Sequence, residues 1–83
     1  MARVKVYSTS YCGYCVRAKQ LLAKRGIDFD EVDVTGDEAA RGFLVKRSGR
    51  RSVPVIFIDD EAIGGWNELR ELDSRGELQA LLA

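Results

Sequence analysis

Two cysteines separated by two residues are the part of this sequence best suited to chemistry. Cys12 and Cys15 lie in the stretch YCGYC, and the chain of 83 residues has no other cysteine and no histidine. Such a pair can form a structural disulfide, ligate a metal ion, carry out thiol–disulfide exchange, or lie buried and inert. Zinc takes four ligands, so a zinc site within one chain is disfavoured. A disulfide that closes so short a loop constrains the unfolded chain little, which disfavours a purely structural bridge.

The position of the pair in the predicted structure favours exchange chemistry. Residues 4–7 alternate between apolar and polar types, as in a strand, and a helical pattern runs from Cys12 until Gly26. Free N–H groups and the helix dipole stabilise a thiolate at a helix start, where cysteine pKa values fall to roughly 3.5–7.5. Cys15 lies nearly one turn later on the same face. We therefore expect Cys12 to attack and Cys15 to resolve the resulting mixed disulfide.

Together with the first strand and helix, the pattern of the remaining chain predicts an α/β domain with the order β-α-β-α-β-β-α. Thr35 and Glu38 have the spacing of a capping box, with Thr35 as the residue that caps the second helix. The first βαβ unit should be parallel and the last two strands antiparallel, so the sheet is mixed, with helices on both faces. The predicted elements are a strand over 27–34, a helix ending near 48–49, a buried strand over 53–58, a turn at 59–61, a short strand at 62–63, a helix over 66–73 and a last helical turn or two over 78–82.

Composition and charge limit the classes of partner. Hydrophobic residues make up 46% of the chain, as in an ordinary globular protein, and 13 basic residues balance 13 acidic ones. This balance argues against nonspecific nucleic-acid binding. No segment has the apolar core of a signal peptide or the length to cross a bilayer. We therefore expect one domain over residues 1–83, in the cytoplasm, where thiols are kept reduced, with no nucleic-acid or membrane partner.

Several short motifs follow one another along the whole chain, at 6–8, 12–15, 17–19, 21–22, 47–50, 52–54, 56–58 and 63–65. The C-x-x-C pair alone is weakly specific, but its combination with a Val-Pro before a strand and a later Gly-Gly is strongly specific. This ordered set resembles the short bacterial glutaredoxins. The resemblance implies a thioredoxin-like fold with a four-stranded mixed sheet.

The resemblance also implies the reaction and its partners. Glutaredoxins reduce glutathione mixed disulfides and protein disulfides, with glutathione as the co-substrate that returns the electrons. The expected partners are glutathione and proteins that carry disulfides or glutathione adducts, and the chain is expected to be a monomer. A different kind of redoxin, a hydrogen donor for ribonucleotide reductase served by thioredoxin reductase, fits the Ser-Val-Pro and Gly-Gly context less well.

A glutathione site follows from the same resemblance. Pro54 is expected to follow a cis peptide bond and to face the cysteines, and the Val53 backbone is expected to pair with the cysteinyl part of the ligand. Tyr14 should flank the sulfur. The full set of expected glutathione-binding residues is Tyr14, Arg47, Val53, Pro54, Gly65, Asn67 and Glu68.

The charged ends of glutathione require complementary groups. Gly65 and the helix start after it are expected to offer N–H groups to the glutamyl carboxylate. The family has an acidic pair for the ammonium group, whereas this chain has Asn67 and Glu68, so only one charge remains. Among the basic residues at 46–47 and 50–51, Arg47 is assigned to the glycyl carboxylate. The simpler interpretation of these basic residues is a solvated surface.

Three positions depart from the family pattern. Thr9 stands where many relatives have a lysine, and Trp66, which could wall the pocket, stands where some have a third cysteine. Gly13 replaces a common proline, so the loop is more flexible. In the family, loops without this proline are associated with a [2Fe-2S] cluster held between two chains by Cys12 of each chain and two glutathione thiols. The alternative function is thus a cluster-binding dimer that acts as a carrier or sensor. For either function, the absence of histidine means that thiolate formation is expected to come from the helix, nearby donors and lysines such as Lys19.

Overall fold

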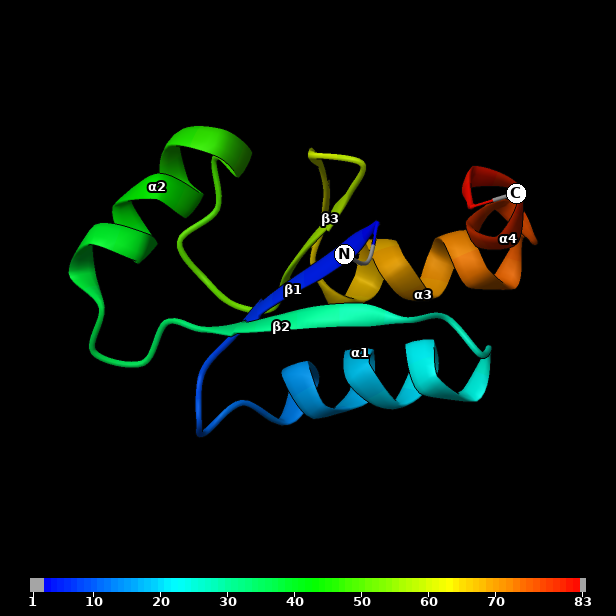
Figure 1. Ribbon diagram of the computed structural model, residues 1–83, viewed down its shortest axis with the longest axis horizontal. Coiled ribbons are helices and arrows are strands. Elements are labelled where there is room, and N and C mark those ends of the chain that lie inside the picture. Colours follow the sequence, from blue (N-terminus) through cyan, green and yellow to red (C-terminus); the bar gives the residue numbers. More distant parts are fainter. Residues whose placement is uncertain (1–2, 83) are drawn as a thin grey trace.

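A four-stranded mixed sheet forms the centre of the protein, as expected (Figure 1). The computed structural model describes residues 3–82. The strands lie in the order β2-β1-β3-β4, with β1 parallel to β2 and antiparallel to β3. The strands are β1 (Val4–Ser8), β2 (Phe29–Asp33), β3 (Val55–Ile58) and β4 (Glu61–Gly64).

Helices cover both faces of this sheet. On one face, α1 and α3 pack beside each other, and α4 adds Leu78 to their core; on the other face lies α2 (Figure 1). The helices are α1 (Gly13–Lys24), α2 (Glu38–Ser48), α3 (Trp66–Ser74) and α4 (Glu77–Leu81).

Two hydrophobic clusters hold the layers together because strand residues alternate between the two faces. The first cluster joins the sheet to α1, α3 and α4 through Val4, Val6, Ala18, Leu22, Ile56, Ile58, Leu69 and Leu78. The second joins the sheet to α2 through Val34, Leu44, Val55 and Phe57. All four residues of β3 are buried, as predicted for this apolar run, although the strand begins at Val55 and not at Val53.

The predicted strand boundaries were partly wrong. β2 begins at Phe29 because Gly26 takes a left-handed conformation and the N–H of Ile27 still donates to the Leu22 carbonyl. β4 begins at Glu61, earlier than predicted. Asp59 and Asp60 both adopt positive φ angles, of 51° and 69°, and form the two-residue turn of a β-hairpin.

The predicted cap of α2 was also wrong. Asp37 is the N-cap, and its carboxylate accepts a hydrogen bond of 3.0 Å from the Ala40 N–H. The hydroxyl of Thr35 instead accepts 2.9 Å from the N–H of Ser10. The Thr35 side chain therefore bonds to a residue distant in sequence. This hydrogen bond connects the segment before α2 to the loop that leads to the cysteines.

Candidate functional site

The cysteine pair occupies the start of α1, where Cys12 is the N-cap residue with an extended backbone. A disulfide joins Cys12 to Cys15, with the Cα atoms 5.1 Å apart. The Cys12 Sγ also accepts a hydrogen bond of 3.0 Å from the Cys15 N–H, in the place where a Ser or Asp oxygen usually caps a helix. Cys15 is 1% exposed, whereas Cys12 is half-buried. The sulfur that an incoming disulfide can reach is therefore that of Cys12.

The segment before β3 lies against this sulfur. The Val53 carbonyl oxygen is 3.6 Å from the Cys12 Sγ, although 41 positions separate the two residues in sequence. The Val53–Pro54 peptide bond is cis, as the resemblance implied, and Pro54 is buried. In the disulfide the sulfur carries no hydrogen, so this approach is a contact; the reduced thiol can donate a hydrogen bond to the same oxygen.

A cavity of about 200 Å³ opens beside the cysteine loop. Its walls come from the start of α1, the segment between α2 and β3, and the start of α3. Five of the expected glutathione-binding residues line it, together with Trp66, which was expected to wall the pocket, and two further residues, Arg50 and Ser52. The lining residues are Tyr14, Arg50, Ser52, Val53, Pro54, Gly65, Trp66 and Asn67.

Comparison with known proteins assigns the family. The glutaredoxin family model matches residues 4–63. The chain belongs to the glutaredoxin family. It is 49% identical over 82 residues to Glutaredoxin 3 of Escherichia coli K12, covering 99% of each chain, and 41% identical over 83 residues to a glutaredoxin of Pseudomonas aeruginosa, covering 100% of this chain and 99% of that one.

Solved glutaredoxin structures have the same fold. The holo form of glutaredoxin C1 from Populus tremula x tremuloides matches with a TM-score of 0.90 at 38% identity, covering 98% of this chain and 83% of that one. A buckwheat glutaredoxin–glutathione complex matches with a TM-score of 0.91 at 31% identity, covering 98% and 76%. As a glutaredoxin with a C-x-x-C pair, the chain is a thiol–disulfide oxidoreductase.

Arg47 does not reach the cavity of this glutaredoxin. Its guanidinium donates a hydrogen bond of 3.0 Å to the Asp60 carbonyl and lies over the rings of Phe43 and Phe57, 5.5 and 5.9 Å from their centroids. These contacts hold Arg47 against the β3–β4 turn. Arg50, three residues later, is the basic residue at the cavity. The sequence showed the basic cluster but not which member faces inward.

Glu68 occupies the anion-binding position at the start of α3. Its Oε1 accepts 2.7 Å from the Gly65 N–H and lies 3.3 Å from Nη2 of Arg50. The Gly65 N–H, and to a smaller extent the neighbouring Arg50 charge, hold the pKa of Glu68 below its usual value. The Gly65 N–H that the resemblance assigned to a ligand carboxylate is therefore already bonded inside the protein.

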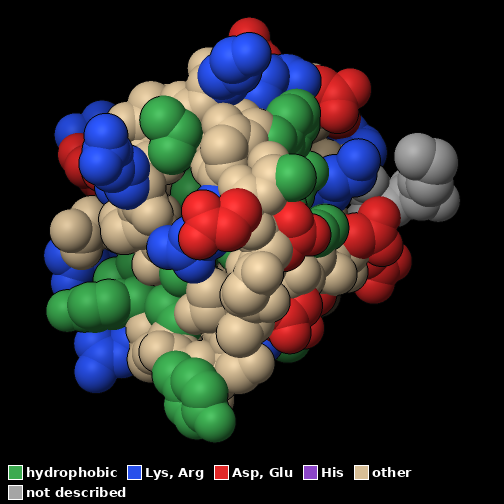
Figure 2. Space-filling model, turned by 90° about the vertical axis from the view of Figure 1, so that its left-hand side faces the viewer, with side chains coloured by type: hydrophobic (Ala, Val, Ile, Leu, Met, Phe, Trp, Pro, Cys, Tyr) green, Lys and Arg blue, Asp and Glu red, His purple; other side chains and the backbone are tan. Residues whose placement is uncertain are grey.

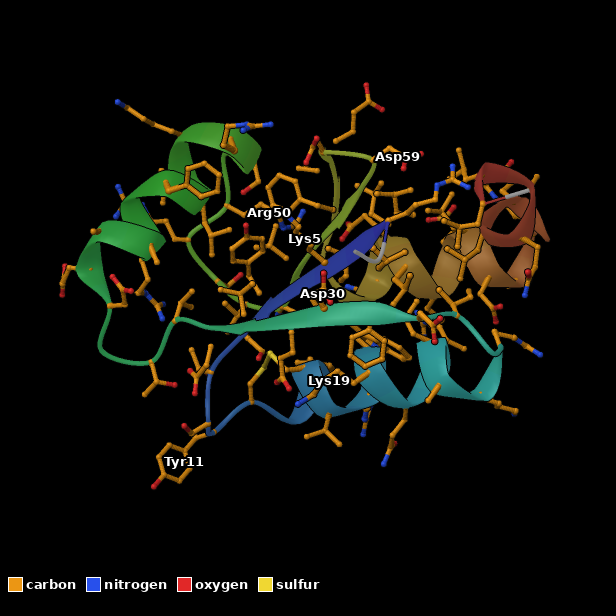
Figure 3. The ribbon with its side chains drawn as sticks, viewed as in Figure 1. Lys5, Tyr11, Lys19, Asp30, Arg50 and Asp59 are labelled. Carbon is orange, nitrogen blue, oxygen red and sulfur yellow. A yellow bond between two sulfur atoms is a disulfide. The ribbon has the colours of Figure 1, made fainter. Side chains whose placement is uncertain are left out.

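Lys19 is engaged by a carboxylate and not by the cysteine pair. Its Nζ donates 2.6 Å to Oε2 of Glu31, which also accepts 2.7 Å from the hydroxyl of the buried Ser8. In Figure 3, Lys19 rises from α1 beside β2. The Lys19 bond first and the Ser8 bond second lower the pKa of Glu31. Lys19 is thus paired with a carboxylate, and its support of the Cys12 thiolate stays a prediction.

The surface around the cysteine loop is open. Tyr11 is 96% exposed and projects away from the body of the protein (Figure 3), and Tyr14 is 57% exposed with Arg17 over its ring. Figure 2 shows the end of the molecule that carries α2 and this loop, with hydrophobic side chains protruding among basic ones. The residues on either side of Cys12 in the loop are therefore accessible at the surface.

The residues of one chain do not fit a [2Fe-2S] cluster. Such a cluster takes four thiolates, whereas this chain has two cysteines, which are bonded to each other, and one of them is buried. Within residues 3–82, no group of three or more His, Cys, Asp or Glu side chains could hold a metal ion.

Across residues 3–82, none of the helices combines the length and apolarity needed to span a membrane.

Proposed function

We propose that this chain is a glutathione-dependent thiol–disulfide oxidoreductase that reduces both glutathione mixed disulfides and protein disulfides. The proposal rests on the position of Cys12, because its half-buried sulfur adjoins a cavity lined by Tyr14, Val53 and Gly65. A thiol ligand bound along Val53 in that cavity would bring its sulfur toward the Cys12 nucleophile. The buckwheat relative in complex with glutathione supports the choice of ligand.

Reduction of a mixed disulfide would need Cys12 alone. Its thiolate attacks the glutathione sulfur, the disulfide bond breaks, and the target protein leaves as a thiolate that takes up a proton. A second glutathione thiolate then attacks the Cys12–glutathione disulfide. Glutathione disulfide leaves and the Cys12 thiolate is restored, so one free glutathione is oxidised for each mixed disulfide reduced. The Cys15 N–H, 3.0 Å from Sγ, stabilises the thiolate before and after each exchange.

Reduction of a protein disulfide would use both cysteines. Cys12 attacks one sulfur of the target and forms a mixed disulfide with it. Cys15 then attacks Cys12, which releases the reduced target and leaves the Cys12–Cys15 disulfide seen in the structure. Two glutathione molecules reduce this disulfide in turn. This chemistry suits a compartment that keeps glutathione reduced, such as the cytoplasm.

The test is Cys12→Ser in an assay that follows NADPH oxidation by glutathione reductase as a glutathione mixed disulfide is reduced. We expect loss of at least about a thousandfold in turnover, because the hydroxyl cannot form the mixed disulfide. Retained glutathione-dependent turnover in a folded Cys12→Ser protein would overturn the assignment. Tyr11→Ser, which changes an exposed residue outside the cavity, is the matched control for the loop.

A further inference from the structure

Arg17 is a cation beside the cysteine loop that has no acidic partner among residues 3–82. Its guanidinium lies over the ring of Tyr14, 5.6 Å from the centroid, and Tyr14 is itself exposed. Stacking on a ring uses the face of the guanidinium and leaves the N–H groups at its edge available to a carboxylate. Tyr14 therefore supports Arg17 in a position from which it can bind an anion that comes from outside the chain.

The other cations at the same helix show the contrast. Lys19 is bonded to Glu31, and Arg25 holds both carboxylate oxygens of Asp73. Neither carboxylate comes from α1, which contains no acidic residue. Within the part of the chain that the structure describes, Arg17 is thus the unpaired cation of α1 that follows the cysteines most closely in sequence.

The charge around the cysteines is one-sided, although the whole chain is neutral. Residues 9–27 include four basic residues and no acidic one, and residues 39–58 include five basic residues and no acidic one, so all 13 acidic residues lie elsewhere. These two segments supply the cysteine pair and most of the cavity wall. The electrostatic potential at the site therefore favours the approach of an acidic partner over that of a basic one.

Arg17 lies outside the cavity, so its contacts depend on the size of the substrate. Tyr14 lines the cavity, whereas Arg17, on the far side of the Tyr14 ring, does not. A ligand that fits within the cavity does not extend to Arg17, but a polypeptide attached at Cys12 continues past Tyr14. The rise along α1 from Cys12 to Arg17 is about 7.5 Å. An extended chain covers this distance in about two residues.

We propose that Arg17 selects protein substrates that carry a carboxylate about two residues from the disulfide-bonded cysteine, by binding that carboxylate while Cys12 attacks. The inference rests on the part of the proposed function in which Cys12 attacks a protein disulfide, and not on glutathione. In this step the Cys12 thiolate attacks one sulfur of the target, the target S–S bond breaks, and the other sulfur leaves as a thiolate. Arg17 binds the segment that becomes attached to Cys12 and takes no part in the electron transfer.

The formation of mixed disulfides with synthetic peptides tests the proposal. The Cys15→Ser protein keeps Cys12 but cannot resolve the product. It is mixed with the disulfide-linked dimer of a short peptide that has glutamate two positions from its cysteine on each side. Two further dimers carry glutamine or lysine at these positions. Mass spectrometry measures the rate constant with which each peptide becomes attached to Cys12.

The charge at position 17 should determine which peptide reacts faster. The ratio of the glutamate to the glutamine rate constant is divided by the same ratio in Arg17→Gln, which cancels the intrinsic reactivity of each peptide. We expect a quotient of about three to five. Arg17→Glu should favour the lysine peptide over the glutamate peptide. Lys24→Gln removes an exposed charge about two turns further along α1 and should change the ratio by less than about 1.5-fold.

Failure of the inference and failure of the proposed function give different results. A quotient near one would overturn the inference, because Arg17 would then affect Cys12 equally for every peptide or not at all. An equal loss of the preference in Lys24→Gln would also overturn it. A preference that depends on Arg17, in a protein without glutathione-coupled turnover, would overturn the glutathione dependence and support the inference. If no peptide becomes attached to Cys12, both proposals are wrong.

Discussion

The Sγ atom of Cys12 lies 3.0 Å from the backbone nitrogen of Cys15, so one cysteine of the pair stabilises the other through its main chain. The side chain of Cys15 has a separate role, because its sulfur is buried and forms the disulfide. The stabilisation of the Cys12 sulfur by the Cys15 N–H and the resolving role of the Cys15 thiol can therefore be separated by substitution.

Cys15→Ser keeps the backbone N–H and removes only the resolving thiol. We expect reduction of glutathione mixed disulfides to stay within about threefold of the unmodified protein, while direct reduction of a protein disulfide falls by at least about a hundredfold. Both rates are measured with glutathione and glutathione reductase. Equal loss of both activities in a folded variant would show that Cys15 is needed for more than resolution.

Gly64→Ala should destabilise the protein by about 1–3 kcal/mol. Gly64 has a φ of 126°, and an added Cβ would lie 2.6–2.9 Å from the side-chain carbons of Glu68. Urea unfolding measures the change in the free energy of unfolding. Gly13→Ala is the control, since an added Cβ there has no atom within 4 Å, and it should be neutral or stabilising by up to about 1 kcal/mol. Equal effects of the two variants would show that crowding between an added Cβ at Gly64 and the Glu68 side chain is not what destabilises the protein.

Glu31 should contribute stability that depends on pH. Its pKa in the folded protein is below the ordinary value of 4.5, owing to Lys19 first and Ser8 second. A carboxylate with a lowered pKa stabilises the fold above its unfolded-state pKa and loses that contribution as the pH falls through its folded-state pKa. We expect Glu31→Gln to lower the free energy of unfolding at pH 7 by about 0.5–1 kcal/mol, because the pair is partly exposed.

The test for Glu31 compares urea unfolding of both proteins at pH 7 and pH 3. The difference between them should shrink at the lower pH, where the carboxylate of the unmodified protein takes up a proton. Glu61→Gln, on the exposed edge strand β4, serves as a control of the same chemical type. A difference that stays constant with pH would show that Glu31 acts through packing and not through its charge.

Anaerobic purification with glutathione present distinguishes the proposed function, for which we expect a colourless monomer, from the cluster-binding alternative. Each chain offers one reachable sulfur, so a [2Fe-2S] cluster would need Cys12 of two chains and two glutathione thiols, and these conditions supply both. The visible absorption spectrum and the mass from size-exclusion chromatography measure this. A brown dimer that bleaches to a monomer would support the alternative function, and Gly13→Pro would then test whether the loop residue permits cluster binding.

The sequence by itself determined the features that depend on local pattern. Hydrophobic periodicity predicted the order of strands and helices, and the strand-to-helix junction placed Cys12 at a helix start, because side-chain spacing and caps act over a few residues. The ordered motifs predicted the glutaredoxin family and most of the residues that line the cavity. These motifs mark the segments that the fold brings together.

Only the tertiary structure decided which polar group each side chain meets. Ser48 ends α2 by donating to the Leu44 carbonyl and accepting from the Arg50 N–H, while Gly49 takes a left-handed conformation. This turn leaves Arg47 on the helix over aromatic rings and directs Arg50 into the cavity. The turn itself is local, but the side chains it presents are held by residues further along the chain: Phe57 and Asp60 for Arg47, and Glu68 for Arg50. A basic cluster looks the same in sequence whichever member faces inward.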